Sequence, residues 1–375
     1  MKIPLYKVYT DEEDVEAVAK IVRRGTYWAG GPEIEEFERV VSSYIGSKFA
    51  VSFNSGTSAL HALMLAYKFK ERDEIVVPSF TFIATANAPL FVGATPIFAD
   101  IEEETYGLDQ EAVKQKINKK TKAIMPIHYG GLPCKDMKAL KEIAEDHQLS
   151  IIEDSAESIG ARINNEKTGG FGDASMISFC GNKVITTGEG GIALTKAKKI
   201  SDRLKLIRSH GRLESEPYFK TTKTLDYVQI GYNWRISAIT AALGISQMKK
   251  VDEVIDSRRR IANYLNERLT RIKEISLPHV PEGFHHVYQM YTIRVRSAVR
   301  NKLREFLSEK GVATKVYFAP VHLTHFYRRL FGFKGGELPA TEKVANEVIT
   351  LPIYPNMQTE EVEYAADCVR DFFLA

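Results

Sequence analysis

Seven short apolar runs between residues 49 and 195 constrain the fold of this chain more than any other feature. Segments such as 59–66 and 137–144 separate several of these runs, and their apolar residues recur at the three- and four-residue spacing of a helix face. Because the runs are apolar throughout, the strands are expected to be covered on both faces, as in a mainly parallel sheet flanked by helices. The expected strands are Phe49–Phe53, Glu74–Val77, Thr95–Ala99, Lys122–Ile127, Ser150–Glu153, Ala174–Phe179 and Gly191–Thr195.

The last third of the chain has a different pattern. Helical spacing continues from Ile236 to Arg271, and new apolar runs follow at Val287–Val295 and Thr314–Phe318. We therefore predict an α/β protein with two domains. Residues 1–249 would form a large domain that includes the N-terminal segment, and residues 250–375 would form a smaller α+β domain.

Composition argues against several classes of function. The chain has 51 basic and 48 acidic residues and no long Lys/Arg run, so we expect no nucleic-acid or membrane partner. The longest apolar runs are strand-sized, and the first residues lack the apolar core of a signal peptide. Three scattered cysteines, Cys134, Cys180 and Cys368, fit a reducing compartment and form no metal-binding motif. We therefore expect a cytoplasmic protein without a metal site.

Two glycine- and hydroxyl-containing turns could bind anions. The stretch 54–58, Asn-Ser-Gly-Thr-Ser, follows the first expected strand and opens a helix, where free N–H groups and the helix dipole suit a phosphate. Alternatively, Ser55 or Thr57 only caps that helix. Asn233 and Arg235 precede the long helical segment and could hold phosphate or carboxylate, or be a cap and a surface charge.

A carboxylate and a lysine follow two other expected strands. Asp154 ends an apolar run, where it either pairs with a group such as a protonated ring nitrogen or caps the next turn. Lys183 lies between an apolar strand and the glycine-rich stretch 187–191, so its amine is either desolvated for chemistry or extended to water. Ser178, at the end of that strand, could donate its hydroxyl to a phosphate. A phosphate turn, a carboxylate for a ring nitrogen and a lysine for an aldehyde are the parts that pyridoxal phosphate chemistry requires.

Motifs along nearly the whole chain resemble one known family. The order FNSGTSALHAL, VPSFTFIATANA, IIEDSAESIGA, GDASMISFCGNKVITTGEGG, RSHG and GYNWRISAITAALG closely resembles the sugar aminotransferases of the DegT/DnrJ/EryC1/StrS family. The likeness extends from RRGTYWAGGPEIEEFE near the N-terminus to YFAPVH in the last quarter. GNKVITTGEGG and EDSAE look most like the branch that makes GDP-perosamine by aminating C4 of GDP-4-keto-6-deoxymannose with glutamate.

The resemblance implies a fold-type-I pyridoxal phosphate enzyme with a mainly parallel seven-stranded sheet. It also implies a homodimer whose active sites lie at the subunit interface. Lys183 would form the Schiff base with the cofactor and move the proton, and Asp154 would keep the ring nitrogen protonated. The implied phosphate ligands are Gly56, Thr57 and Ser178, together with Asn233 of the partner subunit.

Two further positions concern the cofactor ring. Phe82 would stack on the ring, or is instead a buried core phenylalanine. Glu157 stands three residues after the aspartate, where many relatives carry Gln or His near the phenolic oxygen of the cofactor. Glu157 is therefore a candidate cofactor ligand, although a carboxylate is repelled by a phenolate unless it is protonated or turned away. Cys180 replaces the aromatic residue that is usual in the family.

The resemblance also implies sugar-binding residues, taken from stretches that line the substrate cleft in the family. Any one of them could instead have a solvated or structural role. The candidates are Tyr27, Trp28, Arg235, His286 and His322, with Gln289 and Tyr317 as further candidates, of which Tyr317 also fits a core strand position.

The resemblance thus predicts an aminotransferase that moves the amino group of L-glutamate to C4 of a nucleotide-linked 4-keto-6-deoxysugar for polysaccharide or O-antigen biosynthesis. GDP-4-keto-6-deoxymannose is the first choice, and a UDP- or dTDP-linked ketosugar or amination at C3 is the alternative. A dehydratase of the family would carry histidine where this chain has Lys183. A purely regulatory protein would have a damaged cofactor site or a basic appendage, and neither is visible in the sequence.

Overall fold

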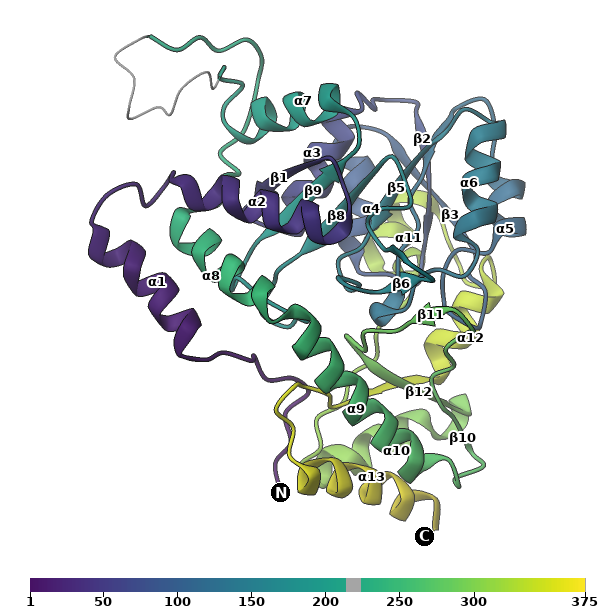
Figure 1. Cartoon of the computed structure of the whole chain (residues 1–375). Coiled ribbons are helices and arrows are strands. Elements are labelled where there is room, and N and C mark those ends of the chain that lie inside the picture. Colours follow the sequence, from purple (N-terminus) through teal and green to yellow (C-terminus); the bar gives the residue numbers. More distant parts are fainter. Residues whose placement is uncertain (214–223, 375) are drawn as a thin grey trace.

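A computed structural model describes residues 1–213 and 224–374 of the chain, with a seven-stranded sheet at its centre (Figure 1). The strand order is β1-β9-β8-β5-β4-β2-β3; β9 runs antiparallel to both of its neighbours, and the other strands share one direction. The predicted mainly parallel sheet is therefore confirmed. The strands are β1 (Phe49–Phe53), β2 (Glu74–Pro78), β3 (Thr95–Ala99), β4 (Thr121–Ile124), β5 (Ser150–Asp154), β8 (Ala174–Ser178) and β9 (Gly191–Thr195).

Helices cover both faces of this sheet, which explains why its strands are apolar throughout. Neighbouring residues of one strand enter different cores: Ile75 and Val77 pack on one face, and Val76 packs on the other. The first face is covered by α3 (Gly56–Ala66), α4 (Ile83–Leu90) and α7 (Lys198–Arg208). The second face is covered by α2 (Pro32–Ile45), α5 (Gln110–Lys116), α6 (Met137–Asp146) and α8 (Ala238–Lys249).

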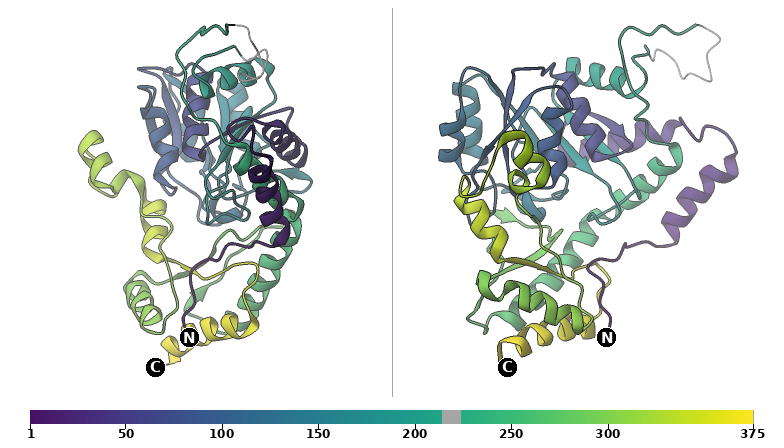
Figure 2. Two further views of the ribbon diagram at one scale, coloured as in Figure 1. Left: turned by 90° about the vertical axis from the view of Figure 1, so that its left-hand side faces the viewer. Right: turned by 180° about the vertical axis from the view of Figure 1, so that it is seen from behind.

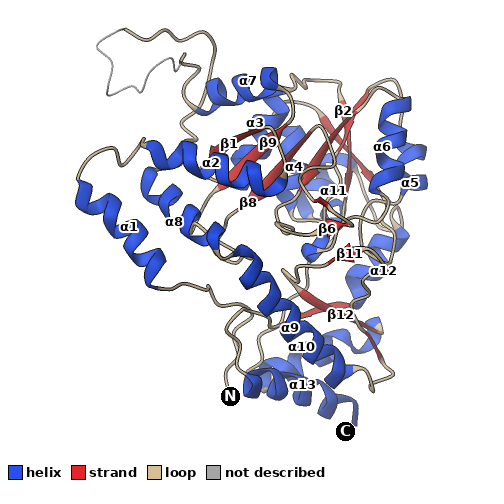
Figure 3. Ribbon diagram, in the orientation of Figure 1, coloured by secondary structure: helices blue, strands red, loops and turns tan. Residues whose placement is uncertain are grey.

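A second sheet, antiparallel and three-stranded, lies at the other end of the molecule (Figure 3). One of its strands was predicted within 287–295, but the predicted strand Thr314–Phe318 is wrong: within that stretch, only Lys315 forms an isolated bridge, to Thr350. The chain leaves the sheet there because the following residues turn towards the large sheet. The elements at this end are β10 (Ile275–Ser276), β12 (Tyr291–Val295), β13 (Val348–Leu351), α9 (Val251–Leu269), α10 (Ser297–Glu309) and α13 (Thr359–Leu374).

The two ends of the molecule are connected at several points. The predicted long helix is divided into α8 and α9 at Lys250, which has non-helical backbone angles. The N-terminus lies beside the C-terminal core, where Ile3 is buried, and α1 (Glu12–Arg24) packs along α8 (Figure 2). Segment 321–338 contributes side chains to the core of the large sheet. The division at residues 249 and 250 therefore stays a prediction.

Short elements complete the description. Among the described residues, no helix combines the length and apolar composition that a bilayer crossing requires. The remaining elements are β6 (Arg162–Ile163), β7 (Glu166–Lys167), β11 (Phe284–His285), α11 (His325–Phe331), α12 (Pro339–Glu347) and the 3-10 turns η1 (Tyr129–Gly131) and η2 (Val321–Leu323).

Candidate active site

The carboxyl ends of β1, β2, β5 and β8 meet at one edge of the large sheet, because these four strands run in the same direction. The turns that follow them carry most of the candidate residues for the cofactor. Ligand sites in open α/β sheets form at this edge. The turns are 54–58, 79–82, 154–157 and 178–183.

Lys183 is withdrawn from solvent and faces a carboxylate. Its side chain is 13% exposed, and its Nζ lies 3.5 Å from Oε1 of Glu157. The other carboxylate oxygen of Glu157 accepts the backbone N–H of Gly130 at 2.9 Å. Burial raises the pKa of Glu157, and the positive charge of Lys183 opposes this rise. The alternative of a lysine extended to water is therefore wrong.

Asp154 is 2% exposed, yet its hydrogen-bond partners are neutral groups. Oδ2 accepts the hydroxyl of Thr85 at 2.7 Å, and Oδ1 accepts the N–H of Ala156 at 3.1 Å. The Thr85 hydroxyl also lies 2.7 Å from the hydroxyl of Thr81. Burial raises the pKa of Asp154, whereas the Thr85 hydrogen bond lowers it. A carboxylate held in this way suits a cationic ring nitrogen.

The turn after β1 has the geometry of an anion site. Ser55 caps α3 by accepting the N–H of Ser58 at 3.1 Å, which confirms the capping alternative for Ser55. The N–H groups of Gly56 and Thr57 lie in the first turn of α3, where no helical carbonyl can accept them. A Cβ on Gly56 would lie 2.9 Å from Met176 Sδ and 3.2 Å from Ser178 Cβ, so glycine brings this backbone close to the serine.

These residues fit pyridoxal phosphate. The first turn of α3 and Ser178 suit its phosphate, Asp154 suits its ring nitrogen, and Lys183 suits its aldehyde. Within residues 1–213 and 224–374, the buried carboxylates of Asp154 and Glu157 have Lys183 as their cationic neighbour and otherwise accept neutral donors, which also favours a bound group that carries positive charge.

Comparison with known families decides the class. The sequence model of the DegT/DnrJ/EryC1/StrS aminotransferase family matches residues 8–370. The chain belongs to this family. The enzyme class predicted from the sequence, a pyridoxal phosphate sugar aminotransferase, is therefore confirmed.

Relatives in the DegT/DnrJ/EryC1/StrS family share nearly the full length of the chain. GDP-perosamine synthase of Escherichia coli O157:H7 is 34% identical over 99% of this chain and 98% of that protein. The UDP-N-acetyl-3-dehydro-alpha-D-glucosamine 3-aminotransferase of Acidithiobacillus ferrooxidans is 32% identical over 96% of this chain and 93% of that protein. The structure of NtdA of Bacillus subtilis with bound cofactor PMP superimposes with a TM-score of 0.90 and 26% identity, over 100% of this chain and 86% of that one.

The structure places the remaining cofactor candidates at the surface of the chain. Phe82 is 58% exposed, so the alternative of a buried core residue is wrong, and its ring is free to face a ligand. Asn233 is exposed, and its backbone bridges to Ser209. Its assignment to the phosphate of the partner subunit stays a prediction.

Three sugar candidates lie on exposed or half-buried segments. Tyr27 and Trp28 are exposed and, with neighbouring residues 26–30, line a cavity of about 340 Å³. The indole N–H of Trp28 donates to the carbonyl of Ile21, which holds the ring against α1. Arg235 donates to the hydroxyl of Ser209 at 3.2 Å.

The two histidine candidates lie inside the protein. The ring of His286 stacks on Tyr288 at 3.9 Å, and its Nδ1 accepts the N–H of Tyr288. Burial lowers the pKa of His286 to about 3, so it is neutral at pH 7. His322 is fully buried between Ser79 and Glu342. These contacts favour the structural alternative for both histidines.

The two further sugar candidates, Gln289 and Tyr317, lie near the segment that carries Lys183. Gln289 donates from Nε2 to the carbonyl of Asn182 at 2.7 Å, directly beside Lys183. Burial and the negative charge of nearby Glu157 raise the pKa of the Tyr317 hydroxyl. Both residues therefore adjoin the predicted catalytic lysine although they come from the C-terminal part of the chain.

Sequence reasoning missed the residues that hold the site carboxylates. Thr85 donates to Asp154, and the backbone of Gly130 donates to Glu157. Thr81 and Thr85 stand four residues apart in the sequence, but only the structure shows that Thr81 precedes α4 and that Thr85 lies inside it, with the two hydroxyls in contact. A backbone N–H such as that of Gly130 leaves no sequence signal.

Proposed function

We propose that this chain transfers the amino group of L-glutamate to C4 of a nucleotide-linked 4-keto-6-deoxysugar, with GDP-4-keto-6-deoxymannose as the first substrate to test. The observation that carries the reaction type is the buried pair of Lys183 and Glu157 beside Asp154, at the edge of the sheet. Similarity to a GDP-perosamine synthase over 99% of the chain supports the choice of sugar.

Bound pyridoxal phosphate supplies an electron sink that stabilises a negative charge on the substrate carbon. The carboxylate of Asp154 would hold the ring nitrogen in its protonated form, and the Thr85 hydroxyl fixes the orientation of that carboxylate. Lys183 would move the proton at the substrate carbon, because its Nζ is a basic atom at this edge and is withdrawn from solvent. The carboxylate of Glu157, 3.5 Å from this amine, holds it in place at this edge.

Phosphate binding in this proposal uses the first turn of α3. The N–H groups of Gly56 and Thr57 and the hydroxyl of Ser178 would hold the anion from three directions. Phe82 would pack on one face of the ring, since its side chain is exposed at the end of the adjacent turn.

We also propose a homodimer whose sites use both chains. The described part of the segment between α7 and α8 extends from the body of the molecule (Figure 1), and it exposes Tyr227, Val228 and 87% of Ile230. Apolar side chains in this position suit a second copy of the chain. Inactive Lys183→Ala and Asn233→Ala proteins, mixed and reassociated, should regain about a quarter of wild-type activity if each site combines these residues from different chains. Activity that stays at the level of the unmixed variants would contradict shared sites.

The proposed reaction can be tested by absorbance spectroscopy. Wild-type protein with pyridoxal phosphate should show a visible band that glutamate abolishes, and Lys183→Ala should show no such response. GDP-, UDP- and dTDP-linked 4-ketosugars are then added separately to the glutamate-treated enzyme. The proposal predicts that GDP-4-keto-6-deoxymannose restores the band fastest, and a response to glutamate that no 4-ketosugar reverses would overturn the proposed acceptor.

A UDP-linked sugar or amination at C3 is the second candidate. It is favoured by the 32% identity to an aminotransferase that is named for C3 of a UDP-linked glucosamine. Selection between such sugars depends on a few hydrogen bonds in the cleft, so the same panel of ketosugars, extended to 3-ketosugars, separates the two.

We also propose a cytoplasmic location. The free state of Cys134, Cys180 and Cys368 supports this location, because disulfides are rare in that reducing compartment.

A further inference from the structure

Contacts of its three buried residues fix the turn that carries Phe82. Ser79, Phe80 and Thr81 are buried, and Phe82, the fourth residue of the turn, is 58% exposed. The ring of Phe80 stacks on Tyr129 at 5.0 Å, and the hydroxyl of Thr81 lies 2.7 Å from that of Thr85. The position of the Phe82 ring therefore depends on how its buried neighbours are fixed.

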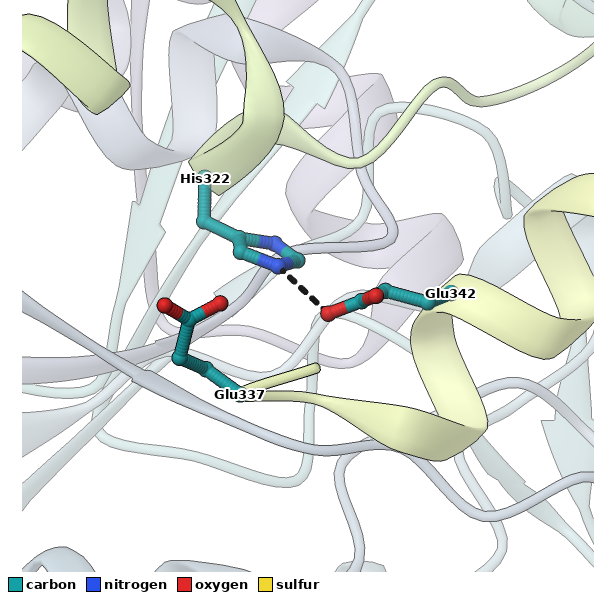
Figure 4. A group of neighbouring side chains, drawn as sticks. All are labelled: His322, Glu337 and Glu342. Carbon is teal, nitrogen blue, oxygen red and sulfur yellow. Dashed lines mark hydrogen bonds and ion pairs between the residues drawn. The ribbon is translucent and has the colours of Figure 1, made fainter. Parts of the chain in front are cut away.

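A hydrogen-bond chain fixes the first residue of this turn. Ser79 Oγ accepts the backbone N–H of His322 at 3.0 Å and lies 2.6 Å from Nδ1 of the same residue. The serine proton is therefore free to be donated to Nδ1, which leaves the imidazole proton on Nε2. Nε2 donates to Oε1 of Glu342 at 3.1 Å (Figure 4). Both nitrogens of the imidazole are thus occupied by hydrogen bonds.

His322 belongs to a segment that contacts the Phe82 turn at further points. The N–H of Val321 donates to the carbonyl of Ser79 at 2.9 Å. The ring of Phe318 lies 6.4 Å from the ring of Phe82. Segment 318–322 and the turn after β2 are therefore packed as one unit, although they are far apart in the sequence.

A metal ion is the competing explanation for this cluster. Ligand atoms of His322, Glu337 and Glu342 lie within 4.8 Å of one another. However, the carboxylate of Glu337 accepts two backbone N–H groups of the turn 334–338, and that of Glu342 accepts two others. Since both imidazole nitrogens also have partners, hydrogen bonds account for the whole cluster without a cation.

We propose that His322 is a positioning residue that sets the Phe82 ring against the cofactor by holding Ser79, and that it does not bind the sugar. This inference rests on the proposed function, in which Phe82 packs on the cofactor ring. His322 then supports the cofactor site, whereas the family resemblance placed it in the substrate cleft. Glu342 in turn orients His322 through Nε2.

A double-mutant cycle tests this inference. His322→Asn removes the imidazole, and with it the contact with Glu342 that orients the group facing Ser79, whereas Phe82→Leu changes an exposed side chain. We expect each single variant to raise the Kd for pyridoxal phosphate about tenfold, which corresponds to the loss of one good contact. The double variant should bind no more weakly than Phe82→Leu alone, because both changes act through the same ring.

Further measurements and control variants separate the alternatives. The visible circular dichroism of the bound cofactor should change in His322→Asn as it does in Phe82→Leu, while the KM for the sugar stays within about twofold. His325→Asn, an exposed histidine nearby, is the matched control and should change neither quantity. Ser79→Ala should reproduce the effect of His322→Asn, and it replaces that variant if the latter does not fold. Chelation of metals from the wild type should leave the Kd unchanged.

The outcomes that overturn the inference are distinct. A raised sugar KM with normal cofactor binding would make His322 a substrate ligand. If the increases in Kd caused by His322→Asn and Phe82→Leu multiply in the double variant, His322 acts on folding in general and not through the Phe82 ring. Loss of cofactor binding after chelation would establish a metal site. A wild type that binds no pyridoxal phosphate overturns the proposed function together with this inference, whereas the other results overturn this inference alone.

Discussion

Replacing Thr85 by valine should raise the pKa of Asp154 still further. The two side chains have similar shapes, so the change mainly removes the hydroxyl that donates to Asp154 Oδ2 at 2.7 Å. A hydrogen bond to an ionised carboxylate is worth about 1.5–3 kcal/mol, and one between neutral groups about 0.5–1.5 kcal/mol. The ionised form therefore loses about 1 kcal/mol more than the protonated form, which corresponds to roughly one pKa unit.

This shift has a defined effect on stability. Burial already raises the pKa of Asp154, so the folded apoprotein binds more protons than the unfolded chain in the pH window between the unfolded and the folded pKa of this group. The apoprotein therefore loses stability as the pH rises through this window. Removing the Thr85 hydroxyl extends the window upward. The destabilisation by Thr85→Val should therefore be about 1 kcal/mol larger at pH 8 than at pH 4.5.

Urea unfolding of the apoprotein at both pH values measures this difference. Titration of Glu157 is common to both proteins and cancels to first order when the variant is subtracted from the wild type. Thr85→Ser keeps the hydroxyl and should show little dependence on pH. A destabilisation by Thr85→Val that is equal at the two pH values, or larger at pH 4.5, would refute the electrostatic role of this hydrogen bond.

Two further predictions concern the same site. Gly56→Ala should raise the Kd for pyridoxal phosphate at least about tenfold, because the new Cβ would lie 2.9 Å from Met176 Sδ, whereas Gly30→Ala meets no atom within 4 Å and should bind normally. Equal affinity of the two variants, measured by cofactor titration, would argue against the anion site. Glu157→Gln should flatten the pH dependence of apoprotein stability in urea, because burial raises the pKa of Glu157 and the wild type loses stability as pH rises through that value. Parallel pH profiles for wild type and variant would show that this carboxylate does not titrate as proposed.

The large sheet could be predicted because its strands carry their own signal. Strands covered on both faces are apolar throughout, and the ends of β1, β3 and β9 fall where the sequence predicts them. The smaller sheet lacks this signal. The run 314–318 predicts a strand, but only Lys315 bridges to β13, and the side chains of 316–318 pack in the aromatic cluster around Phe80. The interruption at Lys250 also depends on distant groups, since its amine pairs with Asp14 of the first helix.

The candidate site was predictable to the extent that its residue types are unusual for their positions. A carboxylate at the end of a buried strand and a lysine before a glycine-rich turn need partners, which identifies Asp154 and Lys183. Partners from distant segments cannot be seen in this way. Ser79 and His322 are 243 residues apart, and only the folded chain shows that they share a hydrogen bond.

The central claim is that Lys183 is the residue to which the cofactor is attached. The most direct measurement is borohydride reduction of the protein loaded with pyridoxal phosphate, followed by proteolysis and mass mapping of the modified peptide. Stoichiometric label on Lys183, absent when glutamate is added before the reduction and absent in Lys183→Ala, is the predicted result. Label spread over surface lysines such as Lys138, or label on Lys183 that glutamate does not remove, would contradict the account.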